Sequence, residues 1–156
     1  MAVLSADVHI PNLGTPTKLT VNAIAGGDTF YKGALVFADA TLGLAQVLPA
    51  ASDKFLGVCA KQVVAAAGDP VEIYVDGIWA FAISGLAATD VGDAVIMDAD
   101  GTLSDNEADL VGATGATVAV TDILIGKCLG ITTEETTRGW TMLHHGGGVA
   151  NVLGWL

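Results

Sequence analysis

Apolar and polar residues alternate along most of the chain in short runs that glycines separate. In residues 18–23, Leu19, Val21 and Ala23 alternate with polar residues, which is the period of a β-strand with one buried face. Further apolar runs cover residues 33–37, 44–48, 55–64, 71–75, 78–83, 94–97, 117–120, 123–131 and 140–143. Helical periodicity is weak throughout, so the pattern predicts an all-β fold with many short strands.

Two Asp-Gly pairs are the clearest turn signals. Asp76-Gly77 lies between the runs 71–75 and 78–83, and Asp100-Gly101 lies between residues 94–97 and 102–103. Because Asp-Gly suits the tight turn that joins antiparallel neighbours, we expect a β-hairpin at each pair. Gly57 lies inside the run 55–64 and predicts a bulge or a close backbone contact there.

One order of features occurs twice: strand, Asp turn, strand, loop, Asp, apolar run, Gly-x-Cys. Residues 33–42 resemble 92–103, and 53–59 resemble 122–128, so Cys59 and Cys128 occupy matching positions. We infer an internal β repeat, with chance similarity between short apolar strands as the alternative. The cysteine spacing gives no zinc signature, and we expect two small buried residues, with one disulfide as the alternative.

The two ends of the chain differ from its middle. Residues 1–17 carry little periodicity, so we interpret them as an extended arm before a β domain at 18–143; an ordinary frayed terminus with one edge strand is the alternative. Residues 144–156 are a glycine-rich joint and an apolar tail, which docks on a neighbour or folds back on its own barrel. The candidate interface residues are Val3, Val8, Ile10, Leu13, Trp140, Val152, Leu153, Trp155 and Leu156.

The balance of charged residues argues against two classes of binding partner. Six Lys and Arg residues stand against 17 Asp and Glu, which gives a net charge of −11. Binding to nucleic acid or to an anionic membrane needs clustered cations, so we expect neither partner. No apolar stretch is long enough for a membrane-spanning helix, and the first residues lack a basic leader, so we expect folding in a cytoplasm.

Candidate catalytic and metal-binding patterns are incomplete. His-Gly-Gly-Gly at residues 145–148 matches an esterase oxyanion motif, but no nucleophile elbow follows it. His144 and His145 are adjacent and lack a third ligand. The acidic residues between 98 and 109 do not have the spacing of an EF-hand, so we expect a solvated acidic hairpin tip, with a looser calcium cage as the alternative. We therefore expect no catalytic residue, no metal ligand set and no cofactor.

The order of segments from Gly57 onward resembles the head decoration, or cement, proteins of tailed bacteriophages. The resemblance covers about two thirds of the chain. It rests on the Gly-Val-Cys strand at 57–59, the Thr-Asp-Val-Gly-Asp-Ala-Val segment at 89–95, the Asp-Gly hairpin at 100–101 and the Ile-Gly strand at 125–126. It implies a compact β-barrel or β-tulip-like subunit with an N-terminal arm and a C-terminal tail.

The same resemblance implies a structural function rather than an enzymatic one. The protein would be made in the host cytoplasm, bind the outer surface of the head and stabilise the shell by bridging capsomers. Its partners would be the major capsid protein, clamped by strand addition of the arm, and its own copies in a trimer. An outer location agrees with the acidic composition.

Two other functions remain open. A virion attachment or tail-associated β module that binds host glycans would show exposed aromatic residues in a groove. A cupin-like enzyme or small-molecule binder would need histidines inside strands, whereas His9, His144 and His145 lie near the chain ends.

Overall fold

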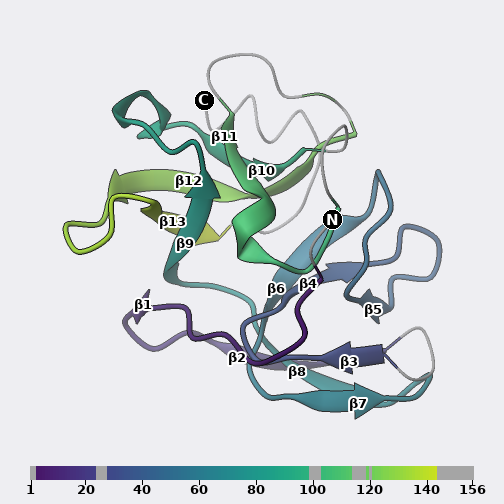
Figure 1. The fold of residues 1–156 in the computed structure, drawn as a ribbon. Helices are drawn as coiled ribbons and strands as arrows, with labels where there is room; N and C mark the ends of the chain where they lie inside the picture. Colours follow the sequence, from purple (N-terminus) through teal and green to yellow (C-terminus); the bar gives the residue numbers. More distant parts are fainter. Residues whose placement is uncertain (1–2, 24–27, 99–102, 114–118, 120, 144–156) are drawn as a thin grey trace.

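The computed structural model describes residues 3–23, 28–98, 103–113, 119 and 121–143 (Figure 1). The all-β prediction is confirmed, because the only helices in these ranges are two single-turn 3-10 segments, η1 (Ala88–Asp90) and η2 (Glu107–Asp109). Neither of them is long or apolar enough to span a membrane. The strands are β1 (Asn12–Leu13), β2 (Lys18–Asn22), β3 (Asp28–Phe30), β4 (Leu35–Ala38), β5 (Ala45–Gln46), β6 (Lys54–Cys59), β7 (Val63–Ala65), β8 (Pro70–Tyr74), β9 (Ile78–Ser84), β10 (Ala94–Met97), β11 (Leu110–Ala113), β12 (Ile123–Ile131) and β13 (Arg138–Leu143).

The strands form two barrels that follow one another along the chain. The first barrel is the sheet β2-β8-β6-β4-β5, and a single parallel bridge between Ala23 and Ala45 joins its two end strands. The second barrel is β9-β11-β10-β12-β13, which closes because β13 also pairs with β9. Strand β1 pairs with β9, and β3 with β7 forms a separate two-stranded sheet.

The two barrels have the same strand order and the same register. β2, β5, β4, β6 and β8 correspond to β9, β11, β10, β12 and β13. The β4–β6 ladder shifts register between Val36 and Phe37, and the β10–β12 ladder shifts at the matching place, between Val95 and Ile96. The internal repeat is therefore confirmed, and it extends to a whole five-stranded barrel.

Gly57 and Gly126 are matching residues that allow a neighbouring strand to come close. A Cβ atom on Gly57 would lie 2.1 Å from the carbonyl oxygen of Tyr74, and one on Gly126 would lie 2.1 Å from that of Met142. No other residue type fits at that separation without moving backbone. The close contact predicted at Gly57 is thus confirmed, and it recurs in the second barrel.

One hydrophobic cluster spans both barrels. Alternate residues of β4 point to opposite faces: Val36 lies in the interior of the first barrel, whereas Leu35 and Phe37 join the cluster that fills the second. Phe55 and Val58 of β6 also belong to the cluster that fills the second barrel. The outer face of the first barrel is therefore the surface on which the second barrel packs.

The hairpin predicted at Asp76-Gly77 is wrong. β8 pairs with β2 and β6, whereas β9 pairs with β1, β11 and β13, so the turn connects the two barrels. Gly77 has the positive φ of a tight turn. The Asp76 carboxylate, however, accepts hydrogen bonds from the backbone N–H and the hydroxyl of Thr17. The turn signal was correct, but it did not determine which strands pair.

The partner expected for residues 94–97 is also different. β10 pairs with β11 and β12 rather than with residues 102–103. Leu103 is not in a strand, and Thr102 lies outside the described residues. The predicted strand at 117–120 falls almost wholly outside them as well.

Candidate functional site

The structure distributes the candidate interface residues over different environments. Val3 and Leu13 are exposed, Val8 and Trp140 are partly buried, and Ile10 is 4% exposed within the core. Ile10 is therefore not available to a partner in the folded chain. Val152, Leu153, Trp155 and Leu156 lie outside the described residues, as does the apolar tail to which they belong.

The N-terminal arm is bound to its own chain along its described length. Its first contact is a hydrogen bond from the Leu4 N–H to the Asp105 carboxylate, at 2.9 Å. Val8 N–H then donates to the Lys32 carbonyl, and Ala80 N–H donates to the Pro11 carbonyl. The arm thus contacts both barrels, and Figure 1 shows its purple trace passing between them.

The outer face of the second barrel carries a row of apolar side chains. In β13, Gly139, Thr141 and Leu143 are buried, so Trp140 and Met142 point outward. Met142 lies opposite Ile78, which in turn lies opposite Leu13 of β1. Leu13, Met142 and the bulge residue Leu129 are 50%, 39% and 45% exposed. We call these five residues, Leu13, Ile78, Leu129, Trp140 and Met142, the apolar face.

A hollow of about 550 Å³ adjoins the apolar face. Its walls come from the arm, β9, β13 and the loop that precedes β13: His9, Pro11, Ala80, Thr132, Thr133, Glu134, Glu135, Arg138 and Trp140. It places the Trp140 ring beside several hydrogen-bonding side chains in a concave surface, and a smaller hollow of about 140 Å³ does the same at Tyr74 and Trp79.

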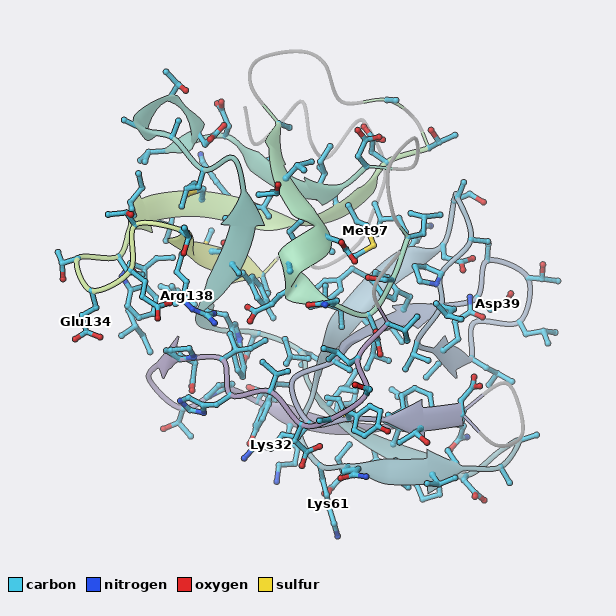
Figure 2. The ribbon with its side chains drawn as sticks, in the orientation of Figure 1. Lys32, Asp39, Lys61, Met97, Glu134 and Arg138 are labelled. Carbon is cyan, nitrogen blue, oxygen red and sulfur yellow. The ribbon has the colours of Figure 1, made fainter. Side chains whose placement is uncertain are left out.

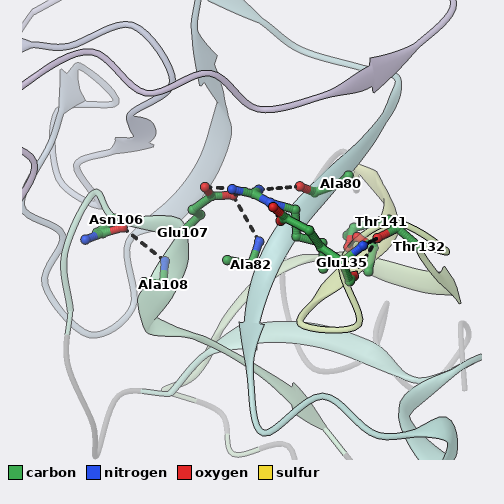
Figure 3. Close-up of polar contacts among 10 residues, drawn as sticks. Ala80, Ala82, Asn106, Glu107, Ala108, Thr132, Glu135 and Thr141 are labelled. Carbon is green, nitrogen blue, oxygen red and sulfur yellow. Dashed lines mark hydrogen bonds and ion pairs between the residues drawn. The ribbon is translucent and has the colours of Figure 1, made fainter.

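Arg138, which is labelled in Figure 2, lines this hollow, and Figure 3 shows contacts of the labelled Ala80 and Glu107 as dashed lines. The Arg138 Nη1 donates to the Ala80 carbonyl oxygen at 2.8 Å and forms an ion pair with Oε2 of buried Glu107 at 3.1 Å. Its Nε donates to the exposed Glu135. Burial would lower the pKa of Arg138, but the charges and hydrogen bonds of Glu107 and Glu135 together outweigh burial and raise that pKa. The guanidinium is therefore fixed in place and charged.

Sequence reasoning missed this ion pair. Arg138 is the single arginine of the chain and follows Glu134 and Glu135 in sequence. That proximity could have indicated the Glu135 contact. The Glu107 contact joins residues 31 apart in sequence and follows only from the closure of the barrel.

The corresponding face of the first barrel is more polar, although Tyr74 takes the place of Met142. By the shared register, Ile78 corresponds to Lys18, Ala80 to Thr20 and Trp140 to Glu72. A hollow of about 380 Å³ occupies the matching place, lined by Thr20, Lys61, Gln62, Val63, Pro70 and Glu72. The repeat therefore provides an internal reference: at these matching positions the second barrel has apolar residues, whereas the first half of the chain exposes large apolar side chains elsewhere, at Leu19, Leu42, Leu48 and Val64.

The two cysteines occupy equivalent buried sites, as the repeat predicts. The Gly33 N–H donates to the Cys59 carbonyl, and the Gly92 N–H donates to the Cys128 carbonyl. Both thiols are free. Burial raises the pKa of Cys59 to about 11, and it also raises the pKa of Cys128. Neither thiol has the lowered pKa of a nucleophile.

The acidic residues between 98 and 109 point to different partners. Glu107 binds Arg138, Asp109 accepts from the Ser104 hydroxyl, and Asp105 is buried beside the arm. Asp100 lies outside the described residues. Within the described ranges, no three His, Cys, Asp or Glu side chains are grouped in a way that would hold a metal ion.

The histidines offer no catalytic arrangement in the described part of the chain. His9 is exposed on the arm and lines the hollow beside Trp140. The His-Gly-Gly-Gly segment at 145–148 and His144 lie outside the described residues. Comparison with protein-family models, with curated proteins and with solved structures finds no match for this chain.

Proposed function

We propose that this chain is a bacteriophage capsid decoration protein that binds the outer surface of the head and bridges capsomers. It acts as a structural protein without catalysis, on the virion, after synthesis in the host cytoplasm. Its partners are the major capsid protein and its own copies, in a trimer.

The apolar face of the second barrel is the observation that carries this proposal. At the matching positions the first barrel has Lys18, Thr20 and Glu72, with the partly buried Tyr74 in the place of Met142. Exposing Trp140, Met142 and Leu13 instead costs solvation free energy unless a partner covers them. Aromatic residues flanked by apolar neighbours are the usual anchors of protein interfaces.

Two further properties support a surface location on a shell. A net charge of −11 keeps a protein soluble and disfavours contact with packaged nucleic acid. The two barrels pack through one core, so the molecule has two ends. Each end could attach to a different capsomer, which is what bridging requires. The arm, which is held by its own chain, is less suited to clamp the capsid than the resemblance implied.

The test uses heads that lack this protein. Wild-type chain added to them is expected to bind, and Trp140→Ala is expected to weaken binding about 30-fold, the effect of losing one hot-spot residue. Glu72→Ala changes the matching position of the first barrel and serves as the control, with binding close to wild type. Equal binding by Trp140→Ala and wild type would remove the apolar face from the capsid contact.

The hollow beside Trp140 favours a second function, recognition of host glycans by a virion attachment or tail-associated module. Sugar rings stack on aromatic side chains, and Arg138, Thr132 and Glu135 supply hydrogen-bonding groups around the ring. Tryptophan fluorescence titrated with a panel of host oligosaccharides tests it. Saturable quenching that disappears in Trp140→Ala supports glycan binding, and an unchanged signal with every sugar excludes it for that panel.

A further inference from the structure

The outer edge of β2 exposes backbone groups that point away from the first barrel. Thr17 accepts a hydrogen bond from Val75, and Ala23 donates one to Asp69, so odd-numbered residues of this segment bond toward β8. In an antiparallel pair the intervening residues direct their N–H and C=O groups to the other side. Lys18, Thr20 and Asn22 therefore direct these groups away from β8, and all three residues are exposed; the strand meets β5 only at its far end, at the Ala23–Ala45 bridge.

In the second barrel the same edge is fully covered. Ala80 corresponds to Thr20; its N–H donates to the Pro11 carbonyl and its own carbonyl accepts from Arg138. Ala82 corresponds to Asn22, and its N–H donates to the Glu107 carboxylate at 3.0 Å. β1 pairs with Ile78 and Trp79. As a result Ala80 is 1% exposed, whereas Thr20 is an exposed residue.

Within the described residues, the first barrel has none of these covering groups. Pro70 replaces Arg138, and no described residue pairs with β2 on the side away from β8 along Lys18–Asn22. The Lys18 side chain lies over the Tyr74 ring of β8, at 5.9 Å from its centroid, and so lies on the strand face rather than along the edge. An open edge of this kind is a template for another strand.

The two matching hollows differ in the same way. His9 and Pro11 of the arm form one wall of the hollow at Trp140, beside Ala80. The hollow at Thr20 has Lys61, Gln62, Pro70 and Glu72 but no residue of an arm. An extended segment on the β2 edge would supply the missing wall, with its residue opposite Thr20 in the place that Pro11 takes opposite Ala80.

We propose that the β2 edge is a strand-addition site that accepts an extended segment of the shell protein, in the manner in which β9 accepts residues 11–13. The source of the segment rests on the proposed function. The chain's own arm is excluded as the occupant because buried Ile10 holds it at β9. A second copy is disfavoured because one five-residue strand pair buries less than a stable dimer needs and because each copy carries −11.

Thr20→Pro tests the site, because its N–H is not used within the barrel and an edge strand tolerates proline. Thr20→Ala keeps the N–H and is the matched control. With heads that lack the protein, Thr20→Pro is expected to bind at least about tenfold more weakly than wild type, and Thr20→Ala like wild type. Equal binding by all three proteins would overturn the strand-addition site.

A second measurement does not depend on a variant. Hydrogen exchange of the wild-type protein is expected to slow at the Thr20 and Asn22 amides when heads bind, while Leu19 and Val21 are already protected in the free protein. Unchanged exchange at Thr20 and Asn22 in bound protein would overturn the proposal.

Light scattering distinguishes the shell protein from a second copy of this chain as the occupant of the β2 edge. The mass of the free protein is expected to be the same for wild type and Thr20→Pro. A smaller mass for Thr20→Pro would assign the edge to a second copy and refute the shell protein as occupant. Wild type that does not bind heads at all would refute the proposed function and, with it, this source of the strand.

Discussion

Replacing Arg138 by Met tests whether the ion pair with Glu107 holds the second barrel together. The substitution keeps an unbranched side chain of similar length, so the contacts of the aliphatic stem are largely kept. It removes the hydrogen bond to the Ala80 carbonyl and both contacts to the Glu107 carboxylate. Glu107 is 5% exposed and would retain only the Ala82 N–H as a donor. The variant therefore leaves a buried charge without its counterion.

The expected loss of stability follows from that uncompensated charge. Removing one partner of a buried pair costs about 3–5 kcal/mol. For a chain of 156 residues, this corresponds to a fall in Tm of roughly 6–20 °C. Glu135→Ala removes the other partner of the same guanidinium, but the Glu135 side chain is 60% exposed. That loss is expected to stay below about 1 kcal/mol.

Urea denaturation followed by tryptophan fluorescence measures both variants. The double variant Arg138→Met with Glu107→Leu removes the stranded charge and is expected to recover most of the loss, apart from the Ala82 hydrogen bond. If Arg138→Met costs no more than Glu135→Ala, the Glu107 pair does not stabilise the barrel and the reasoning is refuted.

Two further predictions concern the core. Gly126→Ala places a Cβ 2.1 Å from the Met142 carbonyl and is expected to cost about 3 kcal/mol in the same denaturation assay, as is Gly57→Ala; Gly130→Ala, which meets open space, should stay within about 0.5 kcal/mol. Burial, with Asp109 nearby, raises the pKa of Asp105 above its unfolded value of about 3.9. The contribution of the Asp105 carboxyl to folding stability is thus fully present below a pH of about 3.9 and is lost as pH rises through its folded pKa. The Asp105→Asn variant should therefore gain stability relative to wild type between pH 4 and pH 8. A constant difference between the two proteins over that range would contradict the assignment.

Local patterns in the sequence predicted strands and the repeat well. Alternation predicted β2, although Leu19 of its expected buried face is 51% exposed, and an apolar run predicted β12. The repeat could be recognised because only glycine fits at positions 57 and 126, where a neighbouring carbonyl oxygen lies close. An Asp and a Cys also occur at the same spacing from each of these glycines. Such constraints act between residues that are neighbours in sequence or in one pair of strands, so the sequence pattern shows them.

Long-range pairing could not be predicted in the same way. The Asp76-Gly77 pair predicted a hairpin, but the strands on either side belong to different barrels. A turn sequence determines only the local backbone geometry and not which strands pair. The resemblance implied that the arm clamps the capsid protein, whereas in the structure Leu4 of the arm bonds to Asp105, 101 residues away. The open edge of β2 and the ion pair of Arg138 became visible only when the two barrels were compared in register.

The most direct test of the central claim is the heat resistance of heads with and without this protein. Heads that lack it, heated in steps and assayed for release of packaged nucleic acid, are expected to open at a lower temperature than complete heads. Adding back the wild-type chain should restore the higher temperature. Identical opening temperatures with and without bound protein would contradict a function in stabilising the shell.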